Sequence, residues 1–562
     1  MNKELFGVFG GRDALERVRG PDAFDEVVAG DAVAVGLTDP GLDVSGRSDC
    51  YDGPEGVCAV FGEAFAPDGT SEVAEWLATR YAEEGLDAVA DLNGSYVAVV
   101  DDGDRARVVT DAMRSWEVFY VDVGGLRLFG TDVGALRSQV DRPVLSREAL
   151  LEYLHVGTVF GERTLFADIH RVPFDGYLGP DAVGELDRFV YRPESGRAER
   201  RTLDDHAAAL AHRMQRALAR RSGLPGPRGL LLSGGKDSRV FLSQLDIDRC
   251  YTIGDAGSRE VRAASKVAAQ YGADHTILEP DERYLRGDGS KVRYGQSIKE
   301  SLHIHHAGYD DHFDVTTMYH GVLFDTLLKG YFLERAGVEA FGSKLPSARL
   351  ASDPDPVESL LDTLGYFPEE SPTVADAVAE TFDGVAFDDG DSLHLDDPGD
   401  FLRGRLRAEL DRGRDRAESV HNAMDLLVVR NQPVLPFRTH LADNYLESFV
   451  AADAELLDWH LTTPPEHRRD ATFWRALERI DTSIFHHRPP SQPHASRRLN
   501  EIERFLRRKL PFCESFEAAW PDRERLYADC GLAEELFPGQ AAMHRLPARL
   551  QLRANDARWW LE

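Results

Sequence analysis

The sequence predicts an α/β protein in which a β-rich N-terminal part precedes a part built on a parallel sheet. Up to about residue 190, short apolar runs alternate with Gly, Asp and Asn turns, a pattern typical of strands. From about residue 203, short continuous apolar strands alternate with amphipathic helices, which favours a parallel sheet covered on both faces. The chain has 562 residues, more than one hydrophobic core usually serves, so we expect two or three domains.

The N-terminal part is expected to contain helices as well as strands. Helical periodicity appears at 71–84 and 146–155. The predicted strands cover 5–9, 57–61, 96–100, 108–109, 118–123 and 126–129. The polar stretch 193–201 has the composition of a linker, so we place the end of the first domain near residue 190.

The second part is expected to begin with a helix and then to alternate strand and helix. Its predicted helices cover 204–221, the segment that ends at 245, and 259–271, and its predicted strands cover 229–232, 250–253 and 276–278. The stretch 352–400 is dense in Asp, Glu, Pro and Gly and is predicted to be an acidic surface insertion. We therefore expect a second domain over 203–500 and a helical C-terminal extension over 501–562.

Charge and cysteine usage limit the partners that we expect. The chain has 97 Asp and Glu against 65 Lys and Arg, a net charge of −32, and only eight of the basic residues are lysines. Such a surface suits a salt-rich cytosol and argues against a broad nucleic-acid interface. The arginine-rich run at 497–509 is expected to be a solvated helix face. Five cysteines without a Cys-x-x-Cys pair indicate a reducing compartment, and no apolar run reaches about 18 residues, so we predict a soluble, cytoplasmic protein without membrane contact.

One short motif carries the chemistry. A glycine turn follows the strand at 229–232 and opens a helix, and it reads Ser233, Gly234, Gly235, Lys, Asp237, Ser238. Glycines let backbone N–H groups approach phosphate oxygens, and a helix start adds positive potential. The two serine hydroxyls can donate to phosphate, and the aspartate can hold Mg²⁺. No Walker sequence is present, so the motif predicts a different class of phosphate-binding turn.

This turn resembles the pyrophosphate loop of the ATP-pyrophosphatase superfamily, and the sequence around it is similar to the synthetase half of asparagine synthetase. The segments 251–275, 321–331, 434–449 and 464–468 carry the rest of the likeness. The resemblance implies that Asp237 and Asp325 hold Mg²⁺ and that Lys236 and Lys329 balance developing charge. It also implies a nucleotide site formed by the turn residues and by Leu232, Thr252, Ile253, Gly254, His320 and Gly321.

The N-terminal part is similar to the glutaminase domain of the same family, as in Leu-Asn-Gly-Ser-Tyr at 92–96 and Thr-Leu-Phe at 164–166. This likeness implies a four-layer α/β/β/α sandwich of the Ntn-hydrolase type, followed by the parallel-sheet domain of the pyrophosphatase type. The family's glutaminase needs a cysteine after the initiator methionine, and Asn2 stands there. An amide is no nucleophile, so we predict a retained scaffold that does not hydrolyse glutamine.

The synthetase part also departs from the family at three places. Val322 stands where an acidic residue is expected, Thr326 replaces a glutamate, and a lysine expected after Arg488 falls at Pro489-Pro490. Lys236 and Lys329 are the lysines that could supply the missing cation from other directions. The segment 300–312 contains Glu300, His303 and His306 at ligand-like spacing, and it is open between contact with substrate, structural histidines and a transition-metal site.

From these features we predict an ATP- and Mg²⁺-dependent ligase that adenylates a carboxylate, releases pyrophosphate and AMP, and transfers the acyl group to ammonia or another amine. Aspartate as the carboxylate rests on family resemblance alone. A homodimer is left open. Two other functions are considered: an enzyme that activates an RNA base for thiolation, which the charge of −32 disfavours, and a non-catalytic ATP-binding protein in regulation or assembly.

Overall fold

The computed structural model describes residues 1–192, 201–340, 343–364, 372–388, 398–431, 435–490, 494, 499–500, 502–503, 506 and 521–562. Nearly all of the predicted linker and the basic residues of the run at 497–509 lie outside this part. Among the described residues, no helix combines the length and the apolar character that a membrane crossing requires.

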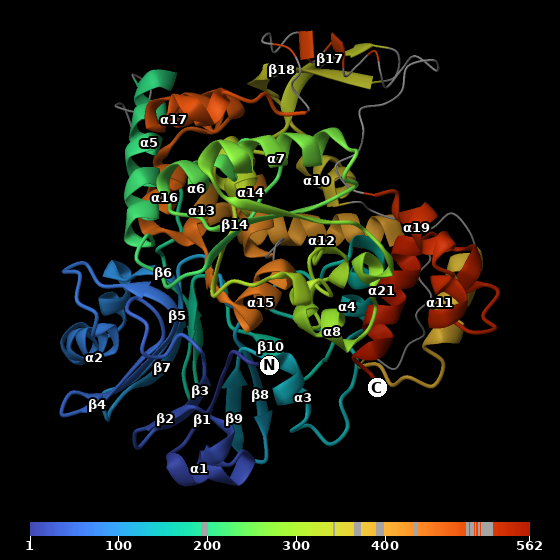
Figure 1. The fold of residues 1–562 in the computed structure, drawn as a ribbon. Coiled ribbons are helices and arrows are strands. Elements are labelled where there is room, and N and C mark those ends of the chain that lie inside the picture. Colours follow the sequence, from blue (N-terminus) through green and yellow to red (C-terminus); the bar gives the residue numbers. More distant parts are fainter. Residues whose placement is uncertain are drawn as a thin grey trace.

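The N-terminal part contains two six-stranded antiparallel sheets, drawn in blue to teal in the lower part of Figure 1. The first sheet has the order β10-β8-β9-β1-β3-β2 and the second has the order β12-β11-β7-β6-β5-β4. The strands are β1 Glu4–Phe9, β2 Glu26–Ala29, β3 Val33–Thr38, β4 Asp49–Gly53, β5 Gly56–Phe65, β6 Asn93–Asp101, β7 Ala106–Thr110, β8 Phe119–Val123, β9 Leu126–Gly130, β10 His170–Arg171, β11 Gly176–Leu178 and β12 Val183–Glu185. Each of the six predicted strands is present.

The two sheets pack face to face and helices cover their outer faces. Val35 and Leu37 of β3 share a buried cluster with Val97 and Val99 of β6, as the alternation of side chains along paired strands requires. Helix α2 (Val73–Glu84) packs on the outer face of the second sheet. Helices α1 (Arg12–Val18), α3 (Val133–Arg137) and α4 (Arg147–Val156) cover the first sheet. The result has four layers in the order α/β/β/α.

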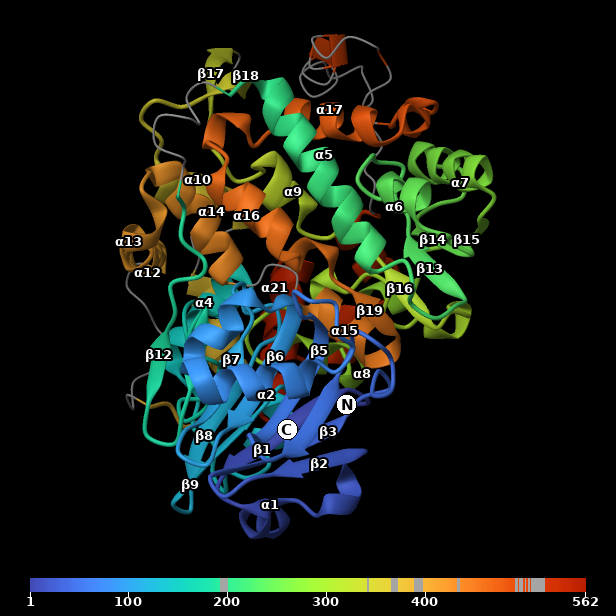
Figure 2. The same cartoon turned by 90° about the vertical axis from the view of Figure 1, so that its left-hand side faces the viewer.

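The second part contains a five-stranded parallel sheet with the order β15-β14-β13-β16-β19. Its strands are β13 Arg228–Leu231, β14 Arg249–Ile253, β15 Asp274–Leu278, β16 Thr317–Tyr319 and β19 Leu446–Ser448. The helices around it are α5 Leu203–Arg220, α6 Arg239–Gln244, α7 Arg259–Tyr271, α9 Phe324–Lys329, α14 Val420–Arg430, α15 Leu435–Asn444, α16 Ala454–Thr462 and α17 Asp470–Ile480. Figure 2 shows α5 and α17 beside each other above this sheet.

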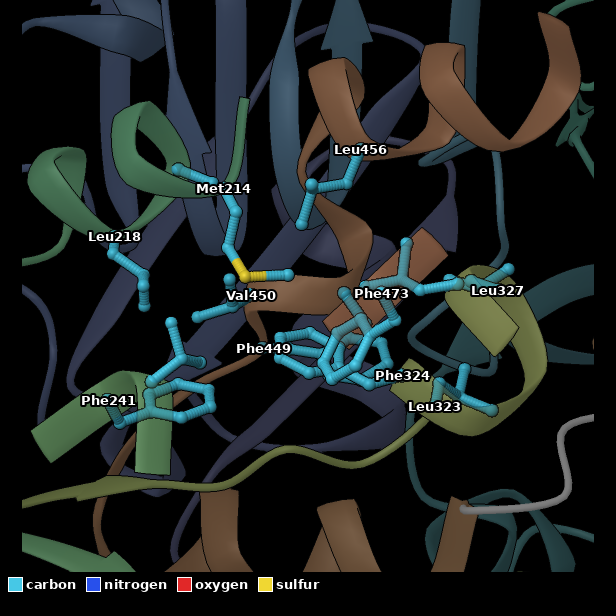
Figure 3. Close-up of a cluster of buried hydrophobic side chains, with 14 of the residues drawn as sticks. Met214, Leu218, Phe241, Leu323, Phe324, Leu327, Phe449, Val450, Leu456 and Phe473 are labelled. Atoms are coloured by element: carbon cyan, nitrogen blue, oxygen red, sulfur yellow. The ribbon is translucent and has the colours of Figure 1, made fainter. Parts of the chain in front are cut away.

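A cluster of large apolar side chains joins these helices (Figure 3). Phe324 of α9 lies between Phe241 of α6 and Phe473 of α17, with ring centroids 5.8 Å and 6.3 Å apart. Met214 of α5 belongs to the same cluster, as does Phe174 from the N-terminal part. Close packing of this kind resists displacement of α9, the helix that carries Asp325.

Buried ion pairs join the two parts as well. Arg221 is fully buried and contacts Glu63 of β5 at 2.8 Å and Asp453, before α16, at 2.8 Å. A buried arginine that keeps both partners holds them in one geometry, because losing either leaves an unpaired buried charge.

Several of the remaining helices share buried clusters with α4 of the N-terminal sandwich. The remaining helices are α8 Gly289–Val292, α10 Pro356–Leu364, α11 Pro372–Thr381, α12 Pro398–Arg412, α13 Arg414–Ala417, α19 Arg523–Asp529, α20 Leu532–Leu536 and α21 Ala548–Trp559, and β17 Arg335–Ala340 pairs with β18 Ser343–Leu350. The stretch 352–400 is more than a surface insertion, because Leu360 of α10 is buried against Leu402 of α12. Helix α21 shares a core with α4, so the C-terminal segment packs on the N-terminal sandwich (Figure 1).

Candidate functional site

A pocket of about 480 Å³ opens at the carboxyl ends of β13, β14 and β16. Loops that leave neighbouring parallel strands meet at that edge, which is where ligands bind in open α/β sheets. The pocket is lined by Leu231, Leu232, Ser233, Asp237, Ser238, Tyr251, Ile253, His305, His306, His320, Gly321, Val322, Leu323, Asp325, Thr326, Tyr331, Phe332 and Phe437. Residues of the glycine turn and of the segment 321–331 therefore face one space.

Eight of the sequence-predicted site residues line this pocket and six do not. The lining includes Leu232, Ser233, Asp237, Ser238, Ile253, His320, Gly321 and Asp325. The lining does not include Gly234, Gly235, Lys236, Thr252, Gly254 and Lys329. The hydroxyl of Thr252 donates to the backbone oxygen of Leu232 at 2.7 Å, which ties the ends of β13 and β14 together.

Asp237 and Asp325, 88 positions apart in the sequence, meet at a single ammonium group. The Nζ of Lys329 lies 2.6 Å from Oδ2 of Asp237 and also contacts Oδ1 of Asp325. Asp325 and Lys329 stand four residues apart on α9, a spacing that brings side chains to one helix face. Leu323, the residue before α9, has φ of +69°, so the turn into this helix is strained.

The pKa values of this group follow from burial and from the shared charge. Burial raises the pKa of Asp237 to about 6, although Lys329 opposes the shift. Burial lowers the pKa of Lys329, but the two carboxylates outweigh it and hold the value above the ordinary one. The three side chains therefore behave as two carboxylates around one cation.

The arrangement of Asp237, Asp325 and Lys329 can be compared with the ligands that Mg²⁺ requires. Two carboxylates already share one cation, and Mg²⁺ is commonly bound through one or two carboxylates, substrate phosphates and water. Asp237 and Asp325 fit that role once Lys329 moves aside. Within the described ranges, no group of three or more His, Cys, Asp or Glu side chains is arranged to hold a metal ion by itself. The transition-metal interpretation of Glu300, His303 and His306 is therefore wrong for the described structure.

The glycine turn presents its amides to oxygen atoms of the chain. The N–H of Gly234 donates to Oε1 of Glu260 at 2.7 Å, and the N–H of Gly235 donates to Oγ of Ser233 at 3.2 Å. Arg239, the first residue of α6, donates to the backbone oxygens of Gly234 and Gly235 at 2.8 Å and 2.7 Å. The turn is thus supported from α6 by an arginine and occupied at one amide by a carboxylate, two contacts that sequence reasoning did not foresee.

Lys236 occupies a different environment from Lys329. Its Nζ lies 3.5 Å from the ring centroid of Trp474 and 4.7 Å from that of Phe485. Burial, followed by the charge of Arg239, lowers the pKa of Lys236 to about 8. Cation–π contact and the apolar stem of lysine favour this placement. The expectation that both lysines balance charge in the pocket therefore has geometric support for Lys329 and none for Lys236.

His320 is held by buried partners. Its Nε2 lies 2.8 Å from Oε1 of Glu447, and its Nδ1 accepts from the N–H of Val322 at 3.4 Å. Arg438 contacts the same carboxylate at 2.9 Å. Burial raises the pKa of Glu447, but Arg438 and then His320 outweigh it and hold the value well below the ordinary one. His320 therefore orients the backbone turn that leads to Asp325.

No protein-family model and no curated protein matches this sequence. Among solved structures, the chain is similar to the glutamine phosphoribosylpyrophosphate amidotransferase from B. subtilis complexed with ADP and GMP. The identity is 11%, the TM-score is 0.19, and the match covers 65% of this chain and 89% of the other. A second structure, described as the allosteric regulatory enzyme of purine biosynthesis, matches at 10% identity and a TM-score of 0.21, over 65% of this chain and 82% of the other. At such scores the likeness carries no argument about this protein's activity.

Proposed function

We propose that the pocket binds ATP with Mg²⁺ and adenylates a carboxylate, which the chain then joins to an amine. The observation that carries the proposal is the meeting of Asp237 and Asp325 on one cation, at the edge of a parallel sheet and beside a glycine turn. Two converging carboxylates beside the Ser233 and Ser238 hydroxyls, which also line the pocket, are groups that a metal-bound triphosphate can use.

The reaction would proceed in two balanced steps. A carboxylate oxygen of the acceptor attacks the α-phosphorus of ATP, the bond to the β-phosphate oxygen breaks, and pyrophosphate leaves. The amine then attacks the acyl carbon, AMP leaves with the bonding electrons, and the amine gives up one proton. When bound, Mg²⁺ supplies charge neutralisation to the pyrophosphate leaving group. Asp237 and Asp325 would hold it, and Lys329 would stand beside the phosphates.

Nitrogen would come from ammonia or another amine rather than from glutamine hydrolysis by a cysteine. Among the described cysteines, burial raises the pKa of Cys50 to about 12 and that of Cys58 well above the ordinary value. A thiol that remains protonated at neutral pH is a poor nucleophile.

Pyrophosphate release on incubation with ATP, Mg²⁺ and a panel of carboxylates tests the proposal. Pyrophosphate release that depends on one particular carboxylate supports the proposal. Asp237→Asn should abolish this release while the variant still folds. A protein that neither binds ATP nor releases pyrophosphate with any acid refutes the proposal.

A non-catalytic ATP-binding protein is the second candidate, and two observations favour it. Lys329 occupies the position between the two carboxylates, and the N–H of Gly234 is already bonded to Glu260. Binding of ATP without pyrophosphate release, under conditions that include ammonia and a broad acid panel, would select this candidate.

A further inference from the structure

Part of the pocket lining is aromatic. We call Tyr251, His305, His306 and Phe437 the aromatic wall, because all four line the pocket. The rings of His306 and Phe437 meet edge to face with centroids 4.6 Å apart. Flat apolar surfaces of this kind favour ring-bearing or otherwise apolar ligands, since they release ordered water and offer edge and face contacts.

His306 of the aromatic wall lacks a hydrogen-bond partner. Its side chain is 1% exposed, and neither Nδ1 nor Nε2 has a partner among the described residues. Burial, followed by the neighbouring His440, lowers the pKa of His306 well below its ordinary value, so the ring is neutral. A neutral imidazole offers one donor and one acceptor. Leaving both unpaired costs folding free energy, and a hydrogen-bonding group brought beside the ring from the pocket would recover part of that cost.

The charged side chains of the pocket also bear on which acceptor fits. Among the residues that the structure describes, no lysine or arginine belongs to its lining, and the charged side chains there are Asp237 and Asp325. Lys329 is committed to those two carboxylates. A small dicarboxylic amino acid would leave one carboxylate unpaired in this space, which is costly in a desolvated site.

The segment that carries His306 is held in place by α21. Glu300 contacts Arg553 of α21 at 2.8 Å, and Asp556 accepts from the N–H of Ser301 at 2.8 Å. All four residues are buried. The aromatic wall is therefore a supported surface and not a loose loop, as a specificity pocket requires.

We propose that the acceptor is a monocarboxylic acid with an apolar, ring-sized body, and that an uncharged hydrogen-bonding group on that body pairs with His306. The inference rests on the proposed function, since it assigns the substrate class of the same site. It departs from aspartate, which the family resemblance alone suggested. Within the pocket, His306 acts as a specificity-determining residue and takes no part in bond making.

Calorimetric titration of the full chain, saturated with Mg²⁺ and α,β-methylene-ATP, tests the substrate class. The ligands are phenylacetate, 4-hydroxyphenylacetate and aspartate. We expect both aromatic acids to bind and aspartate to bind at least about tenfold more weakly than either, because its second carboxylate finds no cation. Binding of aspartate tighter than that of phenylacetate overturns the proposal, as does failure of both aromatic acids to bind the nucleotide-loaded protein.

Substitutions of His306 test its proposed role separately. The preference for 4-hydroxyphenylacetate over phenylacetate is expected to be about fivefold to tenfold, the value of one hydrogen bond. It should vanish in His306→Phe and return in part in His306→Gln. An unchanged preference in His306→Phe overturns the role. Weaker binding of α,β-methylene-ATP in His306→Phe also overturns it, because His306 would then contact the nucleotide. If the unaltered protein does not bind α,β-methylene-ATP at all, the proposed function itself fails.

Discussion

Replacing Lys329 by methionine should expose the two carboxylates to a divalent cation. Methionine has similar length and no charge, so α9 keeps its packing. At present Nζ of Lys329 lies 2.6 Å from Asp237 and contacts Asp325, whose side chain is 60% exposed. Unit charges about 4 Å apart are worth about 4 kcal/mol at an effective dielectric of about 20. Screening reduces the contact with exposed Asp325 to about 1 kcal/mol or less.

Desolvation of the partly buried Asp237–Lys329 pair offsets about half of these contact energies, so we take about 2–3 kcal/mol as the advantage that the ammonium now holds over a competing ion. Each 1.4 kcal/mol is a factor of about ten in affinity. Mg²⁺ or Mn²⁺ should accordingly bind the nucleotide-free Lys329→Met protein about 30- to 100-fold more tightly than the unaltered protein. Titration calorimetry with Mg²⁺, or the free Mn²⁺ signal in electron paramagnetic resonance, measures this change.

Two controls keep the experiment specific. Lys236→Met removes a lysine from the neighbouring turn whose Nζ lies over Trp474 and attracts Asp237 only weakly, so metal affinity should rise far less than in Lys329→Met. Adding Asp237→Asn to Lys329→Met should reverse the gain. If metal affinity in Lys329→Met equals that of the unaltered protein, or if Lys236→Met raises it as much, the geometric reasoning about this site is refuted.

Three further predictions concern pH, buried charge and salt. The pKa of Asp237 is about 6, so pyrophosphate release should fall as pH drops through about 6, and Asp237→Asn should lose at least about 100-fold of the activity across the whole pH profile. The pKa of Asp237 in the folded protein lies above the unfolded value of about 3.9, so its ionisation should lower the free energy of unfolding as pH rises from about 4 to about 6. Chemical denaturation should detect this decrease, and Asp237→Asn should lack it. Arg221→Ala should destabilise the fold by about 3–5 kcal/mol by denaturant titration, since it leaves buried Glu63 and Asp453 unpaired, whereas Arg213→Ala at an exposed pair should cost about 1 kcal/mol or less. The net charge of −32 predicts that the unfolding midpoint rises between about 0.1 M and about 2 M KCl, and a midpoint independent of salt would contradict the halophilic interpretation.

The elements that could be predicted from sequence are those with a strong local pattern. The helix Arg259–Tyr271 has the predicted bounds, because Ser258 caps its start and Gly272 adopts the left-handed conformation at its end. Strand β4 (Asp49–Gly53) was not predicted, because it is a polar strand at the edge of its sheet and lacks apolar alternation. Its pairing with β5 defines it, and pairing is a long-range property.

The candidate site likewise combines features that the sequence predicts with features that depend on long-range contacts. The glycine turn could be recognised from residue types and spacing, and the segment that contains Asp325 from its resemblance to the synthetase family; the pocket has residues of both on its lining. The partners of Lys236 and Lys329 could not be predicted, because both lysines stand beside glycine turns and only the packing of α9 and α17 separates their environments. His306 stood out as one of several histidines, but its lack of partners becomes visible only when all surrounding groups are placed.

Sequence alone determined that the chain would hold strands in its first part, a parallel sheet in its second, and a glycine turn between β13 and α6, because these depend on local periodicity and on glycine at defined positions. Only the tertiary structure decided which charges share a space. Loops from β13 and β16 meet because those strands are neighbours in the sheet, and α21 supports the aromatic wall although it lies near the other end of the chain. Electrostatic and packing energies depend on distance in space, and chain folding brings together residues that the sequence keeps far apart.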